Sequence, residues 1–250
     1  MSRRGETKAP ENKELSEYKQ KLFAAAEELV KVKFPKNVLE FDALLKSPRL
    51  SYDRLGDIIP DKSLNIPEPN SENGKSTDGS PAAKRKRVET DSSAPKGAGF
   101  TNGTVECNEE LAKLMDEVRP KLRDAVEDVN TVKMWITLLI PRIEDGNNFG
   151  VGIQEETLNE VRNVEGEAAS FLDQMSRYFT TRGKLLTKVA KYPAVEDYRR
   201  AILDMDEKQF VNIRLVVLEM RNHFSTLHDM IMKNYEKIKV PRNSNMEHLY

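Results

Sequence analysis

The chain has 250 residues, of which 38% are hydrophobic, 32% are charged and only 7% are aromatic. This length and apolar content suffice for the core of one or two domains, and the mixture is typical of long solvated helices rather than of a sheet-rich enzyme. Lysine and arginine together number 40 against 41 acidic residues, a formal net charge of -1 that argues against nucleic acid as a partner.

Cysteine usage and hydropathy indicate the compartment. The single cysteine, Cys107, excludes an internal disulfide and fits a reducing environment. No apolar run approaches the roughly 18 residues that a membrane span needs. The N-terminal residues Met1–Lys8 lack the apolar core of a secretory signal. We therefore expect an intracellular, soluble protein without a membrane partner.

Residues 1–59 are predicted to form the first long helix. Apolar residues recur there at alternating steps of three and four, the spacing of one helical face: Leu15, Tyr18, Leu22, Ala25, Leu29 and Val32. The series resumes on a shifted face at Val38, Phe41 and Leu45. Because Pro35, between the two series, cannot donate a backbone hydrogen bond, we expect the helix to be kinked or split there.

Residues 60–104 differ in kind from the rest of the chain. They are rich in Pro, Gly, Ser, Asn and charge, which predicts a disordered linker. Four consecutive cations lie within it: Lys84, Arg85, Lys86 and Arg87. An exposed basic run can lie extended in a groove of acidic pockets, which is what a nuclear import signal requires. We expect an import receptor as a partner and a location in the nucleus, with some protein in the cytoplasm; the alternatives are a solvated charge run or a weak nucleic-acid patch.

Residues 105–250 carry three further helical patterns. The first of them begins after Asn108, a favourable N-cap, and follows the stripe Leu111, Met115, Val118, Leu122, Ala125, Val129, Val132, Ile136 and Leu139. The next has the stripe Val161, Val164, Ala168, Phe171, Met175, Tyr178, Leu185 and Val189. Arg182 occupies an apolar slot of this second stripe and precedes Gly183, so we expect the helix to weaken there. The last helix starts near Pro193, ends before Pro241 and has the stripe Phe210, Ile213, Val217, Met220, Phe224, Leu227 and Ile231.

Four long helices with short connections at two of their three joints predict an all-α, antiparallel four-helix bundle. Each helix also carries apolar residues off its main stripe: Val30, Leu114, Val126, Leu138, Leu158, Leu186, Val216 and Met230. This wide apolar surface fits either contacts between neighbouring subunits or a broader core within one chain.

The connection at residues 141–150 is longer than a helix-to-helix turn needs to be. Pro141 cannot continue the preceding helix, and Asp145-Gly146 and Asn147-Asn148 tolerate positive φ. One interpretation is a plain turn whose Asp and Asn side chains cap the helices, with Phe149 packed underneath. The other is a functional loop on a rigid scaffold. A phosphate-binding loop is a poor third interpretation because the Gly-Lys-Ser/Thr ending is missing.

Catalytic and metal chemistry find little support. His223 and His228 are five residues apart, so a helix does not place them on one face, and Cys107 offers no second thiol for zinc. We predict no catalytic residue, no metal site and no cofactor.

The C-terminal tail, residues 241–250, is polar but ends in Glu247, His248, Leu249 and Tyr250. The terminal carboxylate beside two apolar side chains could be captured by a lysine and backbone amides, with Tyr250 in a shallow pocket. The alternative is a frayed terminus.

A resemblance decides between these interpretations. Ile140-Pro-Arg-Ile-Glu-Asp-Gly-Asn-Asn-Phe-Gly-Val151 resembles the activation loop of the 11S proteasome activator family. The resemblance covers nearly the whole chain except the linker. Within the family it is nearest to the nuclear, gamma-type subunit, through the segments 130–135, 191–193, 195–200 and 227–230 and the basic cluster Lys84 to Arg87.

The resemblance implies a ring of seven subunits around a channel, docked on the end of the 20S proteasome. It implies that the tail residues Glu247 to Tyr250 enter pockets between proteasome α-subunits. The loop residues would hold the gate open without ATP or ubiquitin: Arg142, Ile143, Glu144, Asp145, Gly146, Asn147, Asn148, Phe149 and Gly150. The protein would then regulate a protease without being an enzyme. The alternative is a non-enzymatic helical scaffold or adaptor.

Overall fold

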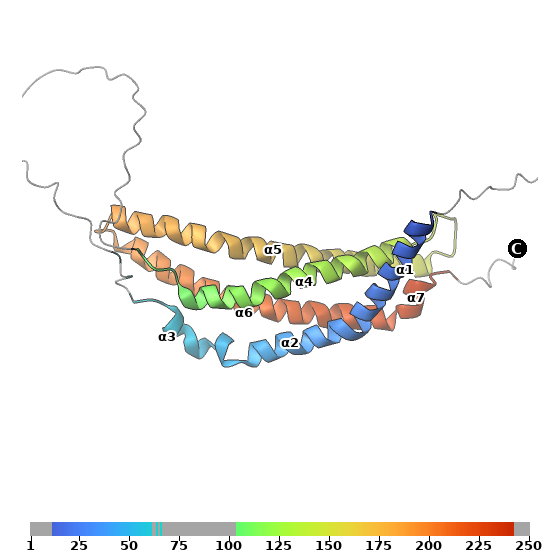
Figure 1. The fold of residues 1–250 in the computed structure, drawn as a ribbon, viewed down its shortest axis with the longest axis horizontal. Helices are drawn as coiled ribbons and strands as arrows, with labels where there is room; N and C mark the ends of the chain where they lie inside the picture. Colours follow the sequence, from blue (N-terminus) through green and yellow to red (C-terminus); the bar gives the residue numbers. More distant parts are fainter. Residues whose placement is uncertain (1–11, 62–63, 65, 67–103, 243–250) are drawn as a thin grey trace, which may run out of the picture.

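The computed structural model describes residues 12–61, 64, 66 and 104–242, and the long elements among them are all helices (Figure 1). The first helical region consists of α1 (Lys13–Glu28), the π-helix η1 (Leu29–Lys33) and α2 (Phe34–Lys46). Three long helices follow: α4 (Glu109–Leu139), α5 (Phe149–Lys191) and α6 (Glu196–Lys233). The short elements are η2 (Pro48–Leu50), η3 (Tyr52–Arg54), α3 (Leu55–Ile58) and α7 (Tyr235–Lys239).

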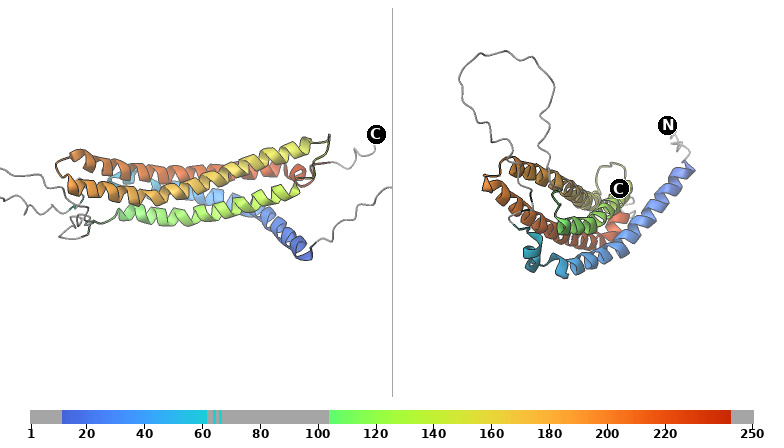
Figure 2. Two further views of the ribbon diagram at one scale, coloured as in Figure 1. Left: turned by 90° about the horizontal axis from the view of Figure 1, so that it is seen from above. Right: turned by 60° about the vertical axis from the view of Figure 1, so that its left-hand side comes forward.

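The long helices lie side by side along one axis, which confirms the predicted four-helix bundle (Figure 1). Helix α5 packs against both α4 and α6, and α2 packs along α6. Helix α1 contacts α4 but leans away from the bundle, as Figure 2 shows from above. The core contains Trp135, fully buried, and an aromatic group in which Phe34 and Phe41 lie 5.0 and 6.0 Å from Phe224, ring centre to ring centre. No described helix is long and apolar enough to cross a membrane.

The predicted break in the first helix is confirmed, and it takes the form of a π-turn just ahead of Pro35. The N–H of Phe34 donates to Leu29 O, five residues back, and Pro35 has no N–H to give. The carbonyl of Val30 therefore lacks a partner within the helix and accepts a hydrogen bond from His228 Nδ1 at 2.8 Å. Because a carbonyl can only accept, Nδ1 of His228 carries the proton. Thus α6 satisfies the polar group that the break exposes.

The apolar face predicted for the first helix enters the core along its second series, where Phe41 and Leu45 are buried. The first series lies mostly outside the core. Leu15, Tyr18 and Val32 are 50%, 55% and 61% exposed, whereas Ala26 and Val30 are fully buried. This helix carries two apolar faces, and the regular spacing of the outer one does not show which of them the bundle covers. We call Leu15, Tyr18, Ala25, Val32 and Leu39 the outer stripe; each of them is exposed. Four of the residues predicted off the main stripes are buried, which favours a broader core there: Val30, Leu114, Leu158 and Val216.

Two further expectations are corrected. Helix α5 does not weaken at Arg182, because the guanidinium is buried and paired with Asp206 of α6, with Nε 3.0 Å from Oδ1. The predicted linker does not begin at residue 60: Leu64 is buried against Val189, Ile202 and Leu203 of α5 and α6. The remainder of that linker, residues 67–103, lies outside the described residues.

Candidate functional site: the loop end of the bundle

The α4–α5 loop, residues 140–148, closes one end of the bundle. Its tip has two left-handed residues, Gly146 at φ 82° and Asn147 at φ 48°, which are two of the four positions predicted to tolerate positive φ. Phe149 and Gly150, which were expected in the loop, are the first two residues of α5. The loop residues therefore form a defined, protruding shape at the junction of two long helices.

The contacts of this loop differ from those of a plain capping turn. Asn148 occupies the N-cap position of α5 but makes no side-chain cap hydrogen bond; its Nδ2 donates instead to Glu144 O at 3.2 Å. Phe149 is 78% exposed and Ile143 is 100% exposed, so neither packs underneath. The interpretation as a capped turn is wrong on both points. Two large apolar side chains are presented to solvent beside a shaped tip, as in a binding loop.

Arg242 joins the loop to the C-terminal segment. Its NH1 donates to Arg142 O and to Glu144 Oε2, both at 2.9 Å, and its NH2 donates to Asn148 Oδ1 at 3.0 Å. Beside it, the backbone of Pro241 lies against Gly150: a Cβ built at Gly150 would stand 2.0 Å from Pro241 O, so only glycine fits there. The start of the C-terminal segment is thus fixed to the base of the loop.

A buried glutamine, Gln154, holds the same end together from inside. Its Nε2 donates to Leu139 O at 3.1 Å and to Ile238 O at 2.7 Å, so α5 binds the end of α4 and the short helix α7. This role of Gln154 was not predicted from the sequence. The available signal was a polar side chain four residues before Leu158 and seven before Val161, on the buried face of α5.

Helix α7 is tied to the N-terminal helix by a small charge cluster. Glu27 Oε1 lies 2.8 Å from Lys239 Nζ, and its Oε2 lies 3.1 Å from Lys31 Nζ. The hydrogen bond from Lys239, reinforced by Lys31, lowers the pKa of Glu27 from 4.5 to about 2. The same hydrogen bond raises the pKa of Lys239. Helix α7, which precedes the C-terminal segment, is therefore held to the N-terminal helix as well as to α5.

This cluster makes the free energy of unfolding depend on pH. Because the pKa of Glu27 is lower in the folded chain, its contribution to the free energy of unfolding is present above about pH 4.5 and is lost as pH falls toward 2. We expect Glu27→Gln to lower stability at pH 7 and to have little effect near pH 2, as measured by denaturant unfolding at both values. A matched change at an exposed pair, Asp229→Asn, tests charge removal alone. An equal loss for Glu27→Gln at both pH values would contradict this account.

The opposite end of the bundle contains a buried polar network around Asp206, which is fully buried. Its carboxylate accepts hydrogen bonds from Tyr178 OH at 2.7 Å, from Arg182 Nε and from Asn108 Nδ2 at 3.0 Å. Burial and the hydrogen bond to Asp206 raise the pKa of Tyr178, so its hydroxyl stays protonated as a donor. Asn108 also caps α4 through Leu111 N and donates to Ile58 O, which joins the chain on both sides of residues 67–103. All these polar groups have partners, so the network is structural.

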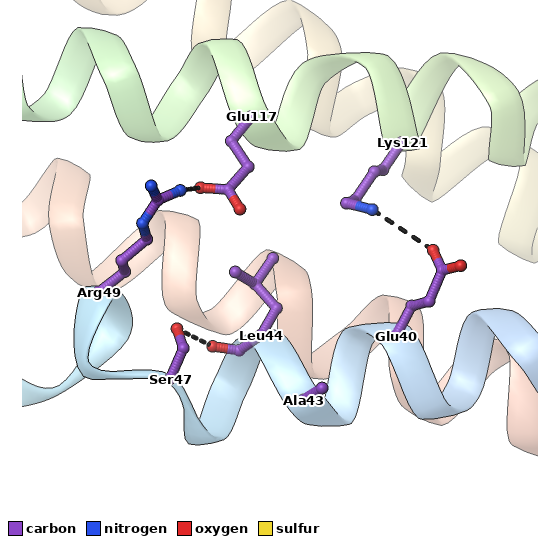
Figure 3. Close-up of a pocket in the computed structure, with 7 residues that line it drawn as sticks. All are labelled: Glu40, Ala43, Leu44, Ser47, Arg49, Glu117 and Lys121. Carbon is purple, nitrogen blue, oxygen red and sulfur yellow. Dashed lines mark hydrogen bonds and ion pairs between the residues drawn. The ribbon is translucent and has the colours of Figure 1, made fainter.

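A shallow hollow of about 510 Å³ lies between α2 and α4, away from the loop (Figure 3). Ion pairs cross it at two places, Arg49 with Glu117 at 2.5 Å and Lys121 with Glu40 at 3.4 Å. Its charges are therefore compensated within the chain. In the part of the chain that the structure describes, no group of three or more His, Cys, Asp or Glu side chains could hold a metal. His223 and His228 have separate partners, Glu167 Oε2 and Val30 O.

The structure thus brings together the predicted residues Arg142 to Gly150 and the first two residues of the predicted tail at one end of the bundle. The tail residues Glu247 to Tyr250 and the basic cluster Lys84 to Arg87 lie outside the described residues. Together, fold and site define a helical-bundle docking protein that presents a shaped loop and the root of its C-terminal segment on one face.

Comparison with known proteins gives the family. The family model described as proteasome activator PA28, C-terminal, matches residues 104–248, and the one described as proteasome activator PA28, N-terminal, matches residues 9–71. The chain belongs to the PA28 proteasome activator family. The resemblance expected from the loop sequence is thereby confirmed.

Relatives and solved structures agree. Proteasome activator complex subunit 3 of Homo sapiens is 50% identical over 240 residues, and that of Gallus gallus is 49% identical; each alignment covers 93% of this chain and 93% of the relative. These relatives confirm the expected resemblance to the gamma-type subunit. The 11S subunit of the Plasmodium falciparum proteasome, PA28, has a TM-score of 0.70 and 30% identity, covering 96% of this chain and 100% of that chain. The P26 activator solved with an archaeal 20S proteasome has a TM-score of 0.60 at 15% identity, over 94% of this chain and 99% of that one, a likeness in fold.

Proposed function

We propose that this protein activates the 20S proteasome without ATP or ubiquitin, as a ring that docks through its C-terminal tails and opens the α-ring gate with the α4–α5 loop. The protein then regulates a protease and has no catalytic site or cofactor of its own. One observation carries this beyond family membership: the exposed loop and the root of the C-terminal segment lie side by side, joined through Arg242. A single partner surface can therefore contact both.

The physical division of labour follows from this arrangement. One short tail binds weakly, but several tails on one rigid ring act at a high effective concentration and gain about 10²–10⁴ in avidity. Opening a gate requires more than binding, because the loop must contact the open state better than the closed one. The tail residues Glu247 to Tyr250 supply the affinity, and the loop supplies the preference for the open state.

A homoheptameric ring is the assembly that we propose, and the outer stripe on α1 and α2 supports it. This face is apolar, exposed in the single chain and regularly spaced, so a second copy can cover it. The molecular mass in solution tests this: a monomer at micromolar concentration would rule the ring out.

The basic cluster Lys84 to Arg87 supports a nuclear location through an import receptor. Four consecutive cations in the segment that joins α3 to α4 offer charge to acidic pockets. If a labelled protein with these four residues changed to alanine still entered the nucleus at the normal rate, this assignment would fail.

The decisive experiment measures hydrolysis of a fluorogenic tripeptide by latent 20S proteasome, without ATP, as the purified ring is added. We expect a several-fold stimulation that disappears when residues 247–250 are deleted. The deletion removes the terminal contacts but leaves Arg242 and the bundle intact. No stimulation by an intact ring would favour the alternative, a helical scaffold or adaptor.

A further inference from the structure

We propose that Arg242 is a positioning residue that holds the α4–α5 loop in its active shape and couples tail docking to gate opening. This proposal rests on the function proposed above. Pro241 and Arg242 lie against the loop and its base, so the two parts are neighbours in space although about 100 residues separate them in sequence.

The guanidinium of Arg242 donates hydrogen bonds to residues on both sides of the loop tip. Before the tip it binds Arg142 O and Glu144 Oε2, and after the tip it binds Asn148 Oδ1. These acceptors are a carbonyl, a carboxylate and an amide, so a planar fork of several donors is needed to satisfy them together. A lysine ammonium has the charge but not this fixed geometry.

Few other contacts hold the tip. Within the loop, Arg142 Nε lies 2.5 Å from Glu144 Oε1, and Asn148 Nδ2 donates to Glu144 O. The large side chains Ile143 and Phe149 are 100% and 78% exposed, so they contribute little packing. By contrast, the Arg242 side chain is only 17% exposed, which strengthens its charge-assisted hydrogen bonds. Arg242 therefore makes a large part of the contacts that select one loop conformation.

The position of Arg242 in the chain makes it a coupler. It directly follows Pro241, whose backbone is pressed against Gly150 at the start of α5, and it lies before the docking residues Glu247 to Tyr250 in the tail. A docked tail therefore fixes Pro241 and Arg242, and these fix the base and the tip of the loop. Without the guanidinium the tail still docks, but the loop samples several conformations and only a fraction of them fits the open gate.

The test compares full-length Arg242→Ala and Arg242→Lys with Lys237→Ala, which removes a cation from nearby α7 without touching the loop. Each ring is titrated against latent 20S proteasome to give the maximal stimulation and the half-maximal concentration. Hydrogen exchange of residues 142–148 is measured on the rings alone, and thermal unfolding and mass confirm that each ring is intact.

For Arg242→Ala we expect maximal stimulation to fall about tenfold, with a half-maximal concentration within about threefold of wild type and faster exchange across the loop. Arg242→Lys should fall between this variant and wild type, and Lys237→Ala should match wild type. The proposal is overturned if Arg242→Ala keeps the maximal stimulation of wild type, or if only its half-maximal concentration rises. The activity of the wild-type ring would still support the proposed function. If the wild-type ring itself does not stimulate the proteasome, the proposed function fails. In that case, unchanged hydrogen exchange of the loop in Arg242→Ala would also overturn the role of Arg242 as a positioning residue.

Discussion

Asn147→Tyr is expected to dock on the 20S proteasome as well as wild type and to stimulate it at least about tenfold less. Asn147 has φ 48°, in the left-handed region where asparagine is tolerated and a bulky residue costs about 1–2 kcal/mol. The neighbouring Gly146, at φ 82°, cannot absorb the change without moving the tip. The tail and the bundle core are untouched. A change in loop shape therefore removes the preference for the open gate and leaves the affinity.

The measurement is a titration of latent 20S proteasome with the variant ring, read as maximal peptide hydrolysis, together with competition against the wild-type ring. Competition reports docking even when stimulation is lost. Asn147→Gly is the matched control, because glycine adopts positive φ freely and should retain most of the stimulation. If Asn147→Tyr stimulates normally, the loop does not act on the gate. If it fails to compete, the loop contributes to docking.

Asn147→Tyr and Arg242→Ala test one loop from two directions. The first changes the backbone that the tip requires, and the second removes the contact that holds the tip against the C-terminal segment. Both are expected to lower maximal stimulation more than affinity. Deletion of residues 247–250 is expected to lower affinity more than maximal stimulation. The three variants together therefore separate docking on the proteasome from opening of its gate.

The sequence predicted the long helices and the loop well because both depend on local rules. Apolar spacing of three and four places the stripes of α4, α5 and α6, and Pro141 and Gly146 mark where the chain must leave helical geometry. Residue type also marks Gly146 and Asn147 as able to adopt positive φ, although Asp145 and Asn148, marked in the same way, do not adopt it. Such features need no knowledge of which helix packs where.

What the sequence could not settle depends on partners distant in the chain. Arg182 looks like a fault in an apolar stripe until Asp206, 24 residues on, is found opposite it. Arg242 looks like an ordinary cation near a polar tail, because its acceptors lie 94 to 100 residues earlier. The first helix has two apolar faces, and only its packing against α4 and α6, which buries Ala26, Val30 and Phe34, decides which face is covered. Tertiary contacts overrode the more regular pattern.

Replacing Arg182 by leucine is expected to lower the free energy of unfolding by about 3–5 kcal/mol, the usual result of leaving a buried charge without its partner. Water cannot replace the lost partner of Asp206, because none of the surface of this residue reaches solvent. The remaining donors, Tyr178 OH and Asn108 Nδ2, offset part of the loss and place it toward the lower end. Denaturant unfolding at one fixed ring concentration measures it, since assembly contributes to the apparent stability. Arg200→Leu, at an exposed pair with Asp204, is the matched control and should change little.

A double-mutant cycle separates charge from packing at this site. Adding Asp206→Asn to Arg182→Leu removes the unpaired charge and should recover part of the lost stability, whereas Asp206→Asn alone strands the guanidinium and should be destabilising. Additive losses would contradict a buried ion pair.

The pair lies at the end of the bundle opposite the loop, so Arg182→Leu should keep normal maximal stimulation well below its melting temperature. Lost stimulation by an intact Arg182→Leu ring would show that the two ends of the bundle are coupled, and the loop end alone would no longer account for activation.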